Sequence, residues 1–386
     1  MQNLPLKLTK SIDKRKKQNA IRSLGYRKDL VDFSSNDYLG FSDLKQIYFS
    51  AEKILKEFNL VCNGASGSRL LTGNHQLFSP TEDFIANFHS AESSLIFNSG
   101  YDANIGFFSS LPQRADLIFY DELAHASIRD GISMSLAKAY KFKHNDIADL
   151  RGLIERSRNK NEESEIYIVT ESVFSMDGDI PDLKTLADFS EEQHCFLVVD
   201  EAHATGVFGS DGAGMVQELG IQDKVFARII TFGKALGCHG AAILGSGAFK
   251  EYLINFARSF IYTTALPPHA VATILASYQY LKSNSEEESE LNKLKQNIEF
   301  FKAEILTNKL QSFFIESNSA IQSCIVPGNE KVKNIALKLE AKGYNVKPIL
   351  SPTVSEGKER LRFCIHSFNS REEISEVLKN LVKANF

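Results

Sequence analysis

Two residues that follow an apolar run have types and spacing that suit several kinds of chemistry. The run 197–199 leads into Asp200, and His203 comes three residues later. An Asp-Glu-Ala-His sequence can hold Mg²⁺ in an ATPase, its carboxylate and imidazole can share a metal ion, or its aspartate can pair with a protonated heterocyclic nitrogen. The ATPase interpretation needs a phosphate loop, and the chain contains no G-x-x-x-x-G-K-[ST] sequence. No third ligand lies at a spacing suited to a metal, so pairing with a heterocyclic nitrogen is favoured.

A lysine after a second apolar run supplies the other group that such a heterocycle would need. Ile229 and Ile230 lead into Thr231, and Lys234 lies in a turn between two glycines. A lysine with a lowered pKa can form a Schiff base with an aldehyde. Pyridoxal phosphate has both features, because it carries an aldehyde on a ring whose nitrogen must be protonated. Most lysines beside glycines are ordinary surface residues, so this interpretation requires Asp200 and Lys234 to meet in the fold.

Three other expected strand ends carry residues suited to the remainder of that cofactor. Ser99 and Gly100 begin a helical stretch, and the N-terminus of a helix with small residues is a ready anion site for a phosphate. His125 follows another strand and could stack on a flat ring, and Glu171 and Ser175 lie at the end of a third. Each feature is weak alone, since turns of this kind are common and most histidines are structural. Together they predict one site.

The elements that must position these residues read as a mostly parallel sheet with helices on both faces. Between residues 90 and 246, short apolar runs alternate with helical segments, and this alternation is typical of α/β proteins. Ligands in such sheets lie at the carboxyl ends of the strands. The expected strands are 94–98, 116–120, 139–143, 165–171, 195–200, 228–231 and 240–244.

The remaining chain predicts two further parts. After a helix over 268–281, the polar acidic segment 283–290 indicates a domain boundary. Helices over 291–308, 332–342 and 371–382 and strands over 320–326 and 360–365 then predict a smaller α+β domain. We therefore expect an N-terminal arm (1–45), a large cofactor-binding domain (46–285) and a small C-terminal domain (286–386).

Composition and charge narrow the class of protein. The chain has 386 residues, of which 43% are hydrophobic and 24% charged, so a large core is possible without disulfides. No apolar run approaches the roughly 20 residues of a membrane span, and no secretory signal opens the chain. Five scattered cysteines without a C-x-x-C pair suggest neither a disulfide framework nor structural zinc. We expect a soluble cytoplasmic protein.

The net charge of −4 conceals an asymmetry. Residues 1–28 hold nine lysines and arginines against one aspartate, a balance of +8, so the remaining chain carries −12. This basic arm is either a solvated helix face or a surface that meets an anionic ligand.

Taken in order, the motifs resemble the α-oxoamine synthases, which are pyridoxal-phosphate enzymes of fold type I, the aspartate aminotransferase fold. The matching segments are 34–40, 67–73, 99–104, 125–127, 174–178, 200–203 and 231–234, and with Arg362 they span most of the chain. Cys238-His239 departs from the family's pattern, and packing is the favoured role for Cys238.

The resemblance implies an acyltransferase that condenses an amino acid with an acyl thioester and releases CO₂. It is strongest to the branch that joins L-alanine to a pimeloyl thioester, carried by CoA or by an acyl carrier protein, in biotin synthesis. The alternatives are glycine with an acetyl thioester and serine with a long acyl thioester. The resemblance implies no metal, no nucleic acid and no membrane partner.

The resemblance also implies a role for each matching residue. Lys234 would bind the cofactor covalently and move the α-proton, Asp200 would pair with the pyridine nitrogen, and His125 would stack on the ring. His203 would hydrogen-bond the phenolic oxygen, with Ser175 and Glu171 among the residues around the cofactor. The phosphate would contact Ser99, Gly100, Tyr101 and Thr231, and Thr264 of a neighbouring subunit, which implies a homodimer with its active site at the interface. Asn36, Arg22 and Arg362 would bind the substrates, with Arg362 taking the amino-acid carboxylate.

Overall fold

The fold is described from a computed structural model, which covers residues 4–22, 24–25, 29–158, 164–283 and 289–384. The chain divides into two compact units. The large unit contains residues 36–175 and 180–292, and the small unit contains residues 1–35, 176–179 and 293–386. The division expected from the sequence stays a prediction, and most of its boundary segment 283–290 lies outside the described residues.

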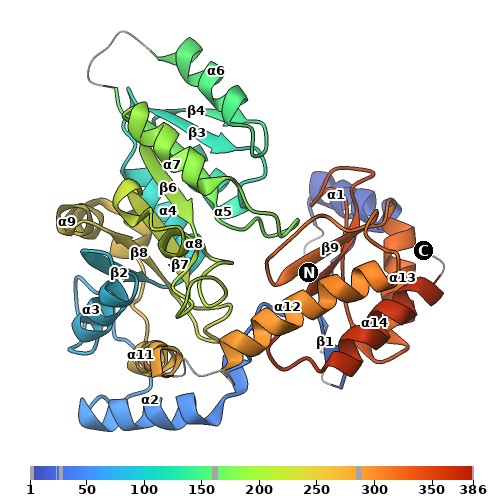
Figure 1. Ribbon diagram of the computed structural model, residues 1–386. Coiled ribbons are helices and arrows are strands. Elements are labelled where there is room, and N and C mark those ends of the chain that lie inside the picture. Colours follow the sequence, from blue (N-terminus) through green and yellow to red (C-terminus); the bar gives the residue numbers. More distant parts are fainter. Residues whose placement is uncertain (1–3, 23, 26–28, 159–163, 284–288, 385–386) are drawn as a thin grey trace. The chain divides into compact units, whose positions relative to one another are not determined.

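A seven-stranded sheet forms the centre of the large unit, in the order β2-β8-β7-β6-β5-β3-β4 (Figure 1). Strands β3 to β7 run parallel, whereas β8 is antiparallel to both of its neighbours, β2 and β7. The mostly parallel sheet and the fold class expected from the sequence are therefore confirmed. The strands are β2 (Ser93–Phe97), β3 (Leu117–Asp121), β4 (Lys138–Phe142), β5 (Ile166–Glu171), β6 (Phe196–Asp200), β7 (Ala227–Thr231) and β8 (Ala241–Gly245).

Helices cover both faces of this sheet, as Figure 1 shows. Several of them begin at a polar side chain that accepts a hydrogen bond from the first turn, as Ser99 does for α4 and Asp182 for α7. The helices of the large unit are α2 (Lys45–Glu57), α3 (Phe78–Phe88), α4 (Gly100–Ser110), α5 (Ala126–Ser133), α6 (Ile147–Ser157), α7 (Leu183–Glu192), α8 (Met215–Glu218), α9 (Gly247–Phe256), α10 (Arg258–Ile261) and α11 (Pro268–Ser283).

The small unit is built on a three-stranded antiparallel sheet of order β11-β12-β9, beside a parallel pair of short strands, β1 and β10. Its expected helices and its two expected longer strands are present, whereas the two-residue strands of the parallel pair were not predicted. The elements are α1 (Leu6–Lys17), β1 (Val31–Asp32), β9 (Ile321–Ile325), α13 (Asn329–Glu340), β10 (Tyr344–Asn345), β11 (Lys347–Ile349), β12 (Arg360–Cys364) and α14 (Arg371–Lys383), with α12 (Glu290–Thr307) beginning three residues before the unit does.

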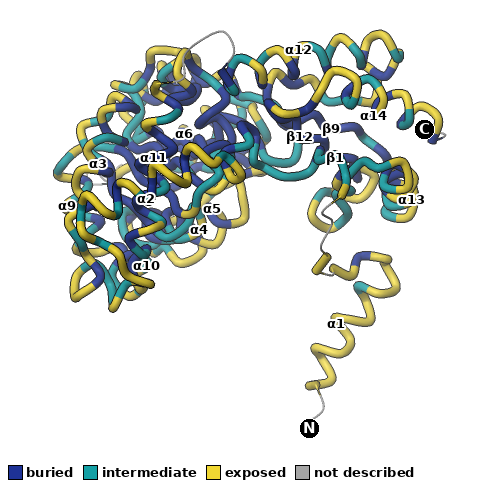
Figure 2. The backbone as a smooth tube through the Cα atoms, turned by 90° about the horizontal axis from the view of Figure 1, so that it is seen from below, coloured by how far each residue is buried: buried dark blue, intermediate teal, exposed yellow. Residues whose placement is uncertain are grey.

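The basic N-terminal arm forms α1, which has no buried residue and is drawn as exposed along almost its whole length in Figure 2. The residues that follow α1 are hydrogen-bonded to α13 of the same unit: Asn329 donates to the Gln18 carbonyl at 3.2 Å, and Lys333 donates to Asn19 Oδ1 at 2.8 Å. Among the described residues, no helix has both the length and the apolar character that crossing a membrane would require.

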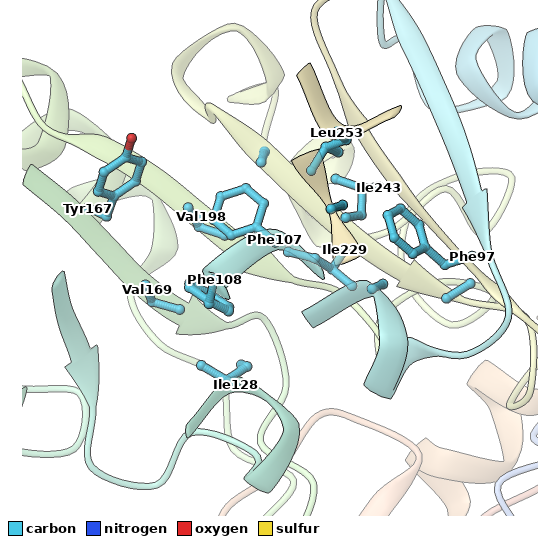
Figure 3. Packing of buried hydrophobic residues seen from close by; sticks show 14 of the residues in the cluster. Phe97, Phe107, Phe108, Ile128, Tyr167, Val169, Val198, Ile229, Ile243 and Leu253 are labelled. Carbon is cyan, nitrogen blue, oxygen red and sulfur yellow. The ribbon is translucent and has the colours of Figure 1, made fainter. Parts of the chain in front are cut away.

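An aromatic cluster between α4 and the sheet forms part of the core of the large unit. Figure 3 shows Phe107 and Phe108 of α4 close to Val198 and Ile229 of the strands beneath them. The Phe107 ring lies 5.7 Å from the Phe249 ring, measured between centroids, and its side chain is fully buried. Since α4 begins at the expected phosphate site, this packing also fixes the position of the residues that are expected to bind phosphate.

We predict that Phe107→Ala lowers the free energy of unfolding of the large unit by about 3–5 kcal/mol, because it leaves a cavity that the packed sheet cannot fill. The measurement is urea unfolding followed by circular dichroism. The matched control is Phe256→Ala on α9, where the side chain is 56% exposed. Equal effects of the two substitutions would contradict the assignment of Phe107 to the core.

Candidate active site

The register of three parallel strands brings the expected site residues to one edge of the sheet. Glu171 at the end of β5 pairs with Asp200 at the end of β6, and Asp200 pairs with Ile229 of β7. Lys234 follows the end of β7 by three residues, in the turn that leads to β8. The carboxyl ends of β5, β6 and β7 therefore carry the acidic pair and the lysine.

Lys234 is hydrogen-bonded to a histidine and, through it, to a tyrosine. Its Nζ lies 2.7 Å from His203 Nε2, and His203 Nδ1 lies 2.7 Å from the hydroxyl of Tyr38. Tyr38 and His203 are buried. The turn is held by the Gly237 N–H, which donates to the Lys234 carbonyl, and Gly237 has a φ of 62°, which favours glycine. Tyr38 was not predicted as a site residue, although it lies within the matching segment 34–40.

Asp200 is a buried carboxylate whose two oxygens accept different hydrogen bonds. Oδ1 accepts from the backbone N–H of Ala202 at 2.9 Å, and Oδ2 accepts from Asn104 Nδ2 at 2.9 Å. Asp200 and Asn104 are only 6% and 1% exposed. The amide oxygen of Asn104 is buried and has no hydrogen-bond partner among the described residues. Asn104 was also missed as a site residue, and its only signal was its place at the end of the segment 99–104.

Glu171 is a second buried carboxyl beside Asp200. Its Oε1 accepts from the backbone N–H of His125 at 2.6 Å. Burial, and then the charge of Asp200, raise the pKa of Glu171 to about 8, while the charge of Lys234 acts in the opposite direction. Two buried carboxyls side by side favour one shared negative charge over two, which is the direction of this shift.

His125 lies at the N-cap of α5 and has an exposed side chain. Its Nδ1 lies 2.7 Å from Ser127 Oγ. Desolvation by the surrounding chain lowers the pKa of His125; Asp200 raises it and Lys234 lowers it further. The imidazole thus combines polar contacts at one edge with an accessible surface, as a ring that stacks on a ligand would require.

The expected phosphate ligands lie in two places: most are at the start of α4 and the end of β7, and Thr264 follows α10. Ser99 and Gly100 begin α4 next to Thr231: a methyl group added at Gly100 would lie 3.7 Å from the Thr231 side chain. Tyr101 is half exposed, and its hydroxyl donates to Asp130 at 2.8 Å, which raises the pKa of Tyr101. Thr264 is exposed, and its carbonyl accepts from Asn98 at 2.7 Å.

The remaining expected residues lie elsewhere in the chain. Ser175, half-buried, follows β5 in the large unit, and Asn36 accepts from the Tyr38 hydroxyl at 3.4 Å. Arg22 and Arg362 belong to the small unit. Arg22 donates to Thr353 at 3.3 Å, and Arg362, which is buried on β12, donates to Cys364 Sγ at 3.1 Å. Their roles toward the substrates stay predictions.

Cys238 packs, as favoured from the sequence. Its thiol lies 3.0 Å from the Leu236 carbonyl and 3.0 Å from Ser277 Oγ. Burial raises the pKa of the Cys238 thiol to about 12, so it is protonated and a poor nucleophile near neutral pH.

Comparison with known proteins agrees with this geometry. Residues 28–381 match the family model described as aminotransferase class I and II, and the chain belongs to that family. The family and the fold thus define a pyridoxal-phosphate-dependent enzyme, as the sequence analysis expected.

Within that class the chain is similar to 8-amino-7-oxononanoate synthases. It is 42% identical to the enzyme of that name from Emericella nidulans, over 91% of this chain and 88% of the relative. It is 36% identical to a putative 8-amino-7-oxononanoate synthase from Halalkalibacterium halodurans, over 89% and 84% of the two chains. The expectation of an acyltransferase of this type is confirmed.

Two solved structures cover almost the whole fold. The 8-amino-7-oxononanoate synthase of Francisella tularensis is 30% identical, with a TM-score of 0.76 over 92% of this chain and 97% of that one. The K265A variant of a serine palmitoyltransferase from S. paucimobilis, solved with a bound PLP–myriocin aldimine, is 25% identical, with a TM-score of 0.89 over 99% of this chain and 98% of that one. The second match supports the same fold and the same cofactor class.

We predict that the Tm of Glu171→Gln, measured against that of the unsubstituted protein, increases as the pH rises from about 5 to about 8. The raised pKa means that the folded native chain holds a proton that the unfolded chain has lost in this range, so its stability falls with rising pH. Glutamine does not titrate and removes that loss. The measurement is Tm between pH 5 and 9, with Glu251→Gln on the exposed face of α9 as the control. A difference in Tm that is constant with pH would contradict a raised pKa.

Proposed function

We propose that the chain condenses L-alanine with a pimeloyl thioester and gives 8-amino-7-oxononanoate, CO₂ and the free thiol carrier, in biotin biosynthesis. The observation that carries the proposal is the 42% identity to an 8-amino-7-oxononanoate synthase over most of the chain, combined with the lysine, histidine and aspartate at the strand ends. A cytoplasmic location stays a prediction.

The residues at the strand ends fit pyridoxal phosphate. Asp200 offers a buried carboxylate to a protonated pyridine nitrogen, and the raised pKa of Glu171 beside it disfavours a second negative charge. The unpartnered amide oxygen of Asn104 marks unused hydrogen-bonding capacity in the same place. Ser99, Gly100 and Thr231 place the start of an 11-residue helix where a phosphate can bind its backbone N–H groups.

When bound, pyridoxal phosphate withdraws electrons from the α-carbon of the amino acid. Lys234 would attach the cofactor, take the α-proton and return it at the end, and its hydrogen bond to His203 holds Nζ in place for these transfers. Asp200 would keep a proton on the pyridine nitrogen, and the exposed imidazole of His125 would stack on the ring. The α-carbon would attack the thioester carbonyl, so that the new carbon–carbon bond forms as the thiol departs, and the amino-acid carboxylate would then leave as CO₂.

We also propose a homodimer in which Thr264 reaches the cofactor phosphate of the neighbouring chain. Two observations support this arrangement. Thr264 is exposed, so a second chain can approach it. Its carbonyl accepts a hydrogen bond from Asn98, which holds the exposed Thr264 segment in a defined position for such an approach.

The test of the function is a substrate panel with product mass as the readout. Alanine, glycine and serine are each offered with pimeloyl, acetyl and palmitoyl groups, carried by CoA and by acyl carrier protein. We expect the product of alanine with the pimeloyl group to dominate, and Lys234→Ala to lose both this activity and the visible absorbance of bound cofactor. Preference for serine with palmitoyl, or for glycine with acetyl, would replace the proposal with that activity, and normal cofactor absorbance in Lys234→Ala would refute the lysine assignment.

We expect Arg362→Ala to raise the KM for alanine at least about tenfold, with a much smaller effect on the KM for the thioester. A buried guanidinium can donate two charge-assisted hydrogen bonds to a carboxylate. Removing it would therefore weaken the binding of alanine and leave the binding of the thioester largely unchanged. Steady-state kinetics with each substrate varied in turn provide the measurement. Arg371→Ala, at the exposed start of α14, is the control, and equal changes in the two KM values would exclude the proposed role.

A further inference from the structure

An unbroken path of hydrogen bonds joins Asp200 to His125 through two residues to which the predicted site assigns no role. Asn104 Nδ2 donates to Asp200 Oδ2 at 2.9 Å and lies 3.1 Å from Ser127 Oγ. Ser127 Oγ in turn lies 2.7 Å from His125 Nδ1. Asn104 and Ser127 are each only 1% exposed, so the bonds that Asn104 makes to Asp200 and Ser127 are shielded from water.

The chemistry of the donors fixes the direction of every bond in this path. The backbone N–H of Ser127 points at His125 Nδ1 at 3.2 Å, and a backbone N–H can only donate. His125 Nδ1 must therefore present a lone pair. It follows that the Ser127 hydroxyl also donates to Nδ1, and that the same hydroxyl accepts from the Asn104 amide. The two donors at Nδ1 share its one lone pair, and every donor between Asp200 and the imidazole then points at an acceptor.

A lone pair on Nδ1 places the ring proton of neutral His125 on Nε2. Two donors at one nitrogen favour the neutral ring over the charged one, in which Nδ1 would itself carry a hydrogen. The charged and titratable groups that act on this imidazole are Asp200, Lys234, Arg129 and Asp130, and Glu171 accepts from its backbone N–H. With desolvation, their combined effect lowers the pKa of His125 and agrees with the neutral state.

We infer that Asn104 and Ser127 are positioning residues, which hold His125 as a neutral imidazole with its proton on Nε2 and couple it to the Asp200 carboxylate. The four residues come from three elements: Asn104 from α4, His125 and Ser127 from the start of α5, and Asp200 from the end of β6. The path thus connects the ring proposed to stack on the cofactor with the carboxylate proposed to pair with its pyridine nitrogen.

The role given to a neutral His125 rests on the proposed function, whereas the assignment of its tautomer does not. A positively charged His125 would repel a protonated pyridine ring stacked on it. This repulsion would weaken the pairing of the pyridine nitrogen with Asp200. Keeping His125 neutral removes that repulsion. Because Asn104 donates to Oδ2, it also fixes the orientation of the carboxylate that the pyridine nitrogen would meet.

Imidazole ¹⁵N NMR of the full-length chain tests the inference with and without added pyridoxal phosphate. The chain has nine histidines, and the signal of His125 is the one lost in His125→Gln. In the native chain we expect a neutral ring with hydrogen on Nε2 at pH 7. In Ser127→Ala, one of the two donors to Nδ1 is gone, so we expect the titration midpoint of His125 to rise by about half to one pH unit.

Two controls separate positioning from folding. Ser109→Ala removes a hydroxyl from α4 that donates only to the Ile105 carbonyl of its own helix, and it should leave the His125 signals unchanged. Asn104→Ala should weaken the binding of pyridoxal phosphate about tenfold, read as the cofactor concentration that half-saturates its visible absorbance. Asn255→Ala, at an exposed position of α9, should not change it.

The inference is overturned if native His125 carries its hydrogen on Nδ1, or if Ser127→Ala leaves both the tautomer and the midpoint unchanged. The tautomer of the native chain needs no substitution at Ser127, so poor folding of that variant cannot rescue the inference. Because the spectrum without cofactor does not depend on catalysis, a correct tautomer together with no product in the substrate panel would refute the proposed function alone.

Discussion

The parallel register of β5, β6 and β7 is the constraint on which the candidate site depends. It pairs Glu171 with Asp200 and Asp200 with Ile229, so three segments that are far apart in the chain end at the same edge of the sheet. Side chains alternate along a strand, and a slip of one residue would turn Asp200 to the opposite face. The buried apolar residues of β5 and β6 oppose such a slip, since it would exchange the side chains on both covered faces.

A buried ion pair next to the site reinforces this register. Glu201, which follows Asp200, accepts from Arg228 Nε at 2.7 Å, and Arg228 lies on β7 and also donates to the His89 carbonyl at 2.8 Å. Burying two charges costs desolvation energy, so the pair is weak evidence for net stability; removing one partner, however, would leave an uncompensated charge in the core. The pair connects the turn that carries Asp200 and His203 to the strand that leads to Lys234.

Some residues that form hydrogen bonds at this edge could be identified from the sequence, and others could not. Lys234, Asp200 and His203 could be predicted because each is a chemically distinctive side chain just after an apolar run. Tyr38, Asn104 and Ser127 could not be singled out, because tyrosine, asparagine and serine are common in loops and at helix starts. Their importance comes from partners 165, 96 and 23 residues away along the chain.

The same contrast holds for the fold. The strands of the large sheet could be predicted to within about a residue, since short apolar runs ended by polar residues define them locally. The short strands β1 and β10 could not, because two residues carry no periodicity and their pairing joins Val31 to Tyr344. The grouping of residues 176–179 with the small unit likewise depends on contacts such as that of Ser323 with the Met176 carbonyl, which no local pattern encodes.

The sequence by itself determined the kind of chemistry: a lysine, two acidic residues and two histidines at strand ends, in an order typical of one enzyme family. Side-chain type and the local pattern of apolar residues are properties of short segments, so the sequence alone shows them. Only the tertiary structure decided the protonation of these groups. Burial, and then the charge of Asp200, raise the pKa of Glu171 to about 8. A backbone N–H and a hydroxyl that meet at Nδ1 favour the neutral form of His125. Charge states depend on distance and burial, which are known only once distant segments of the chain have packed together.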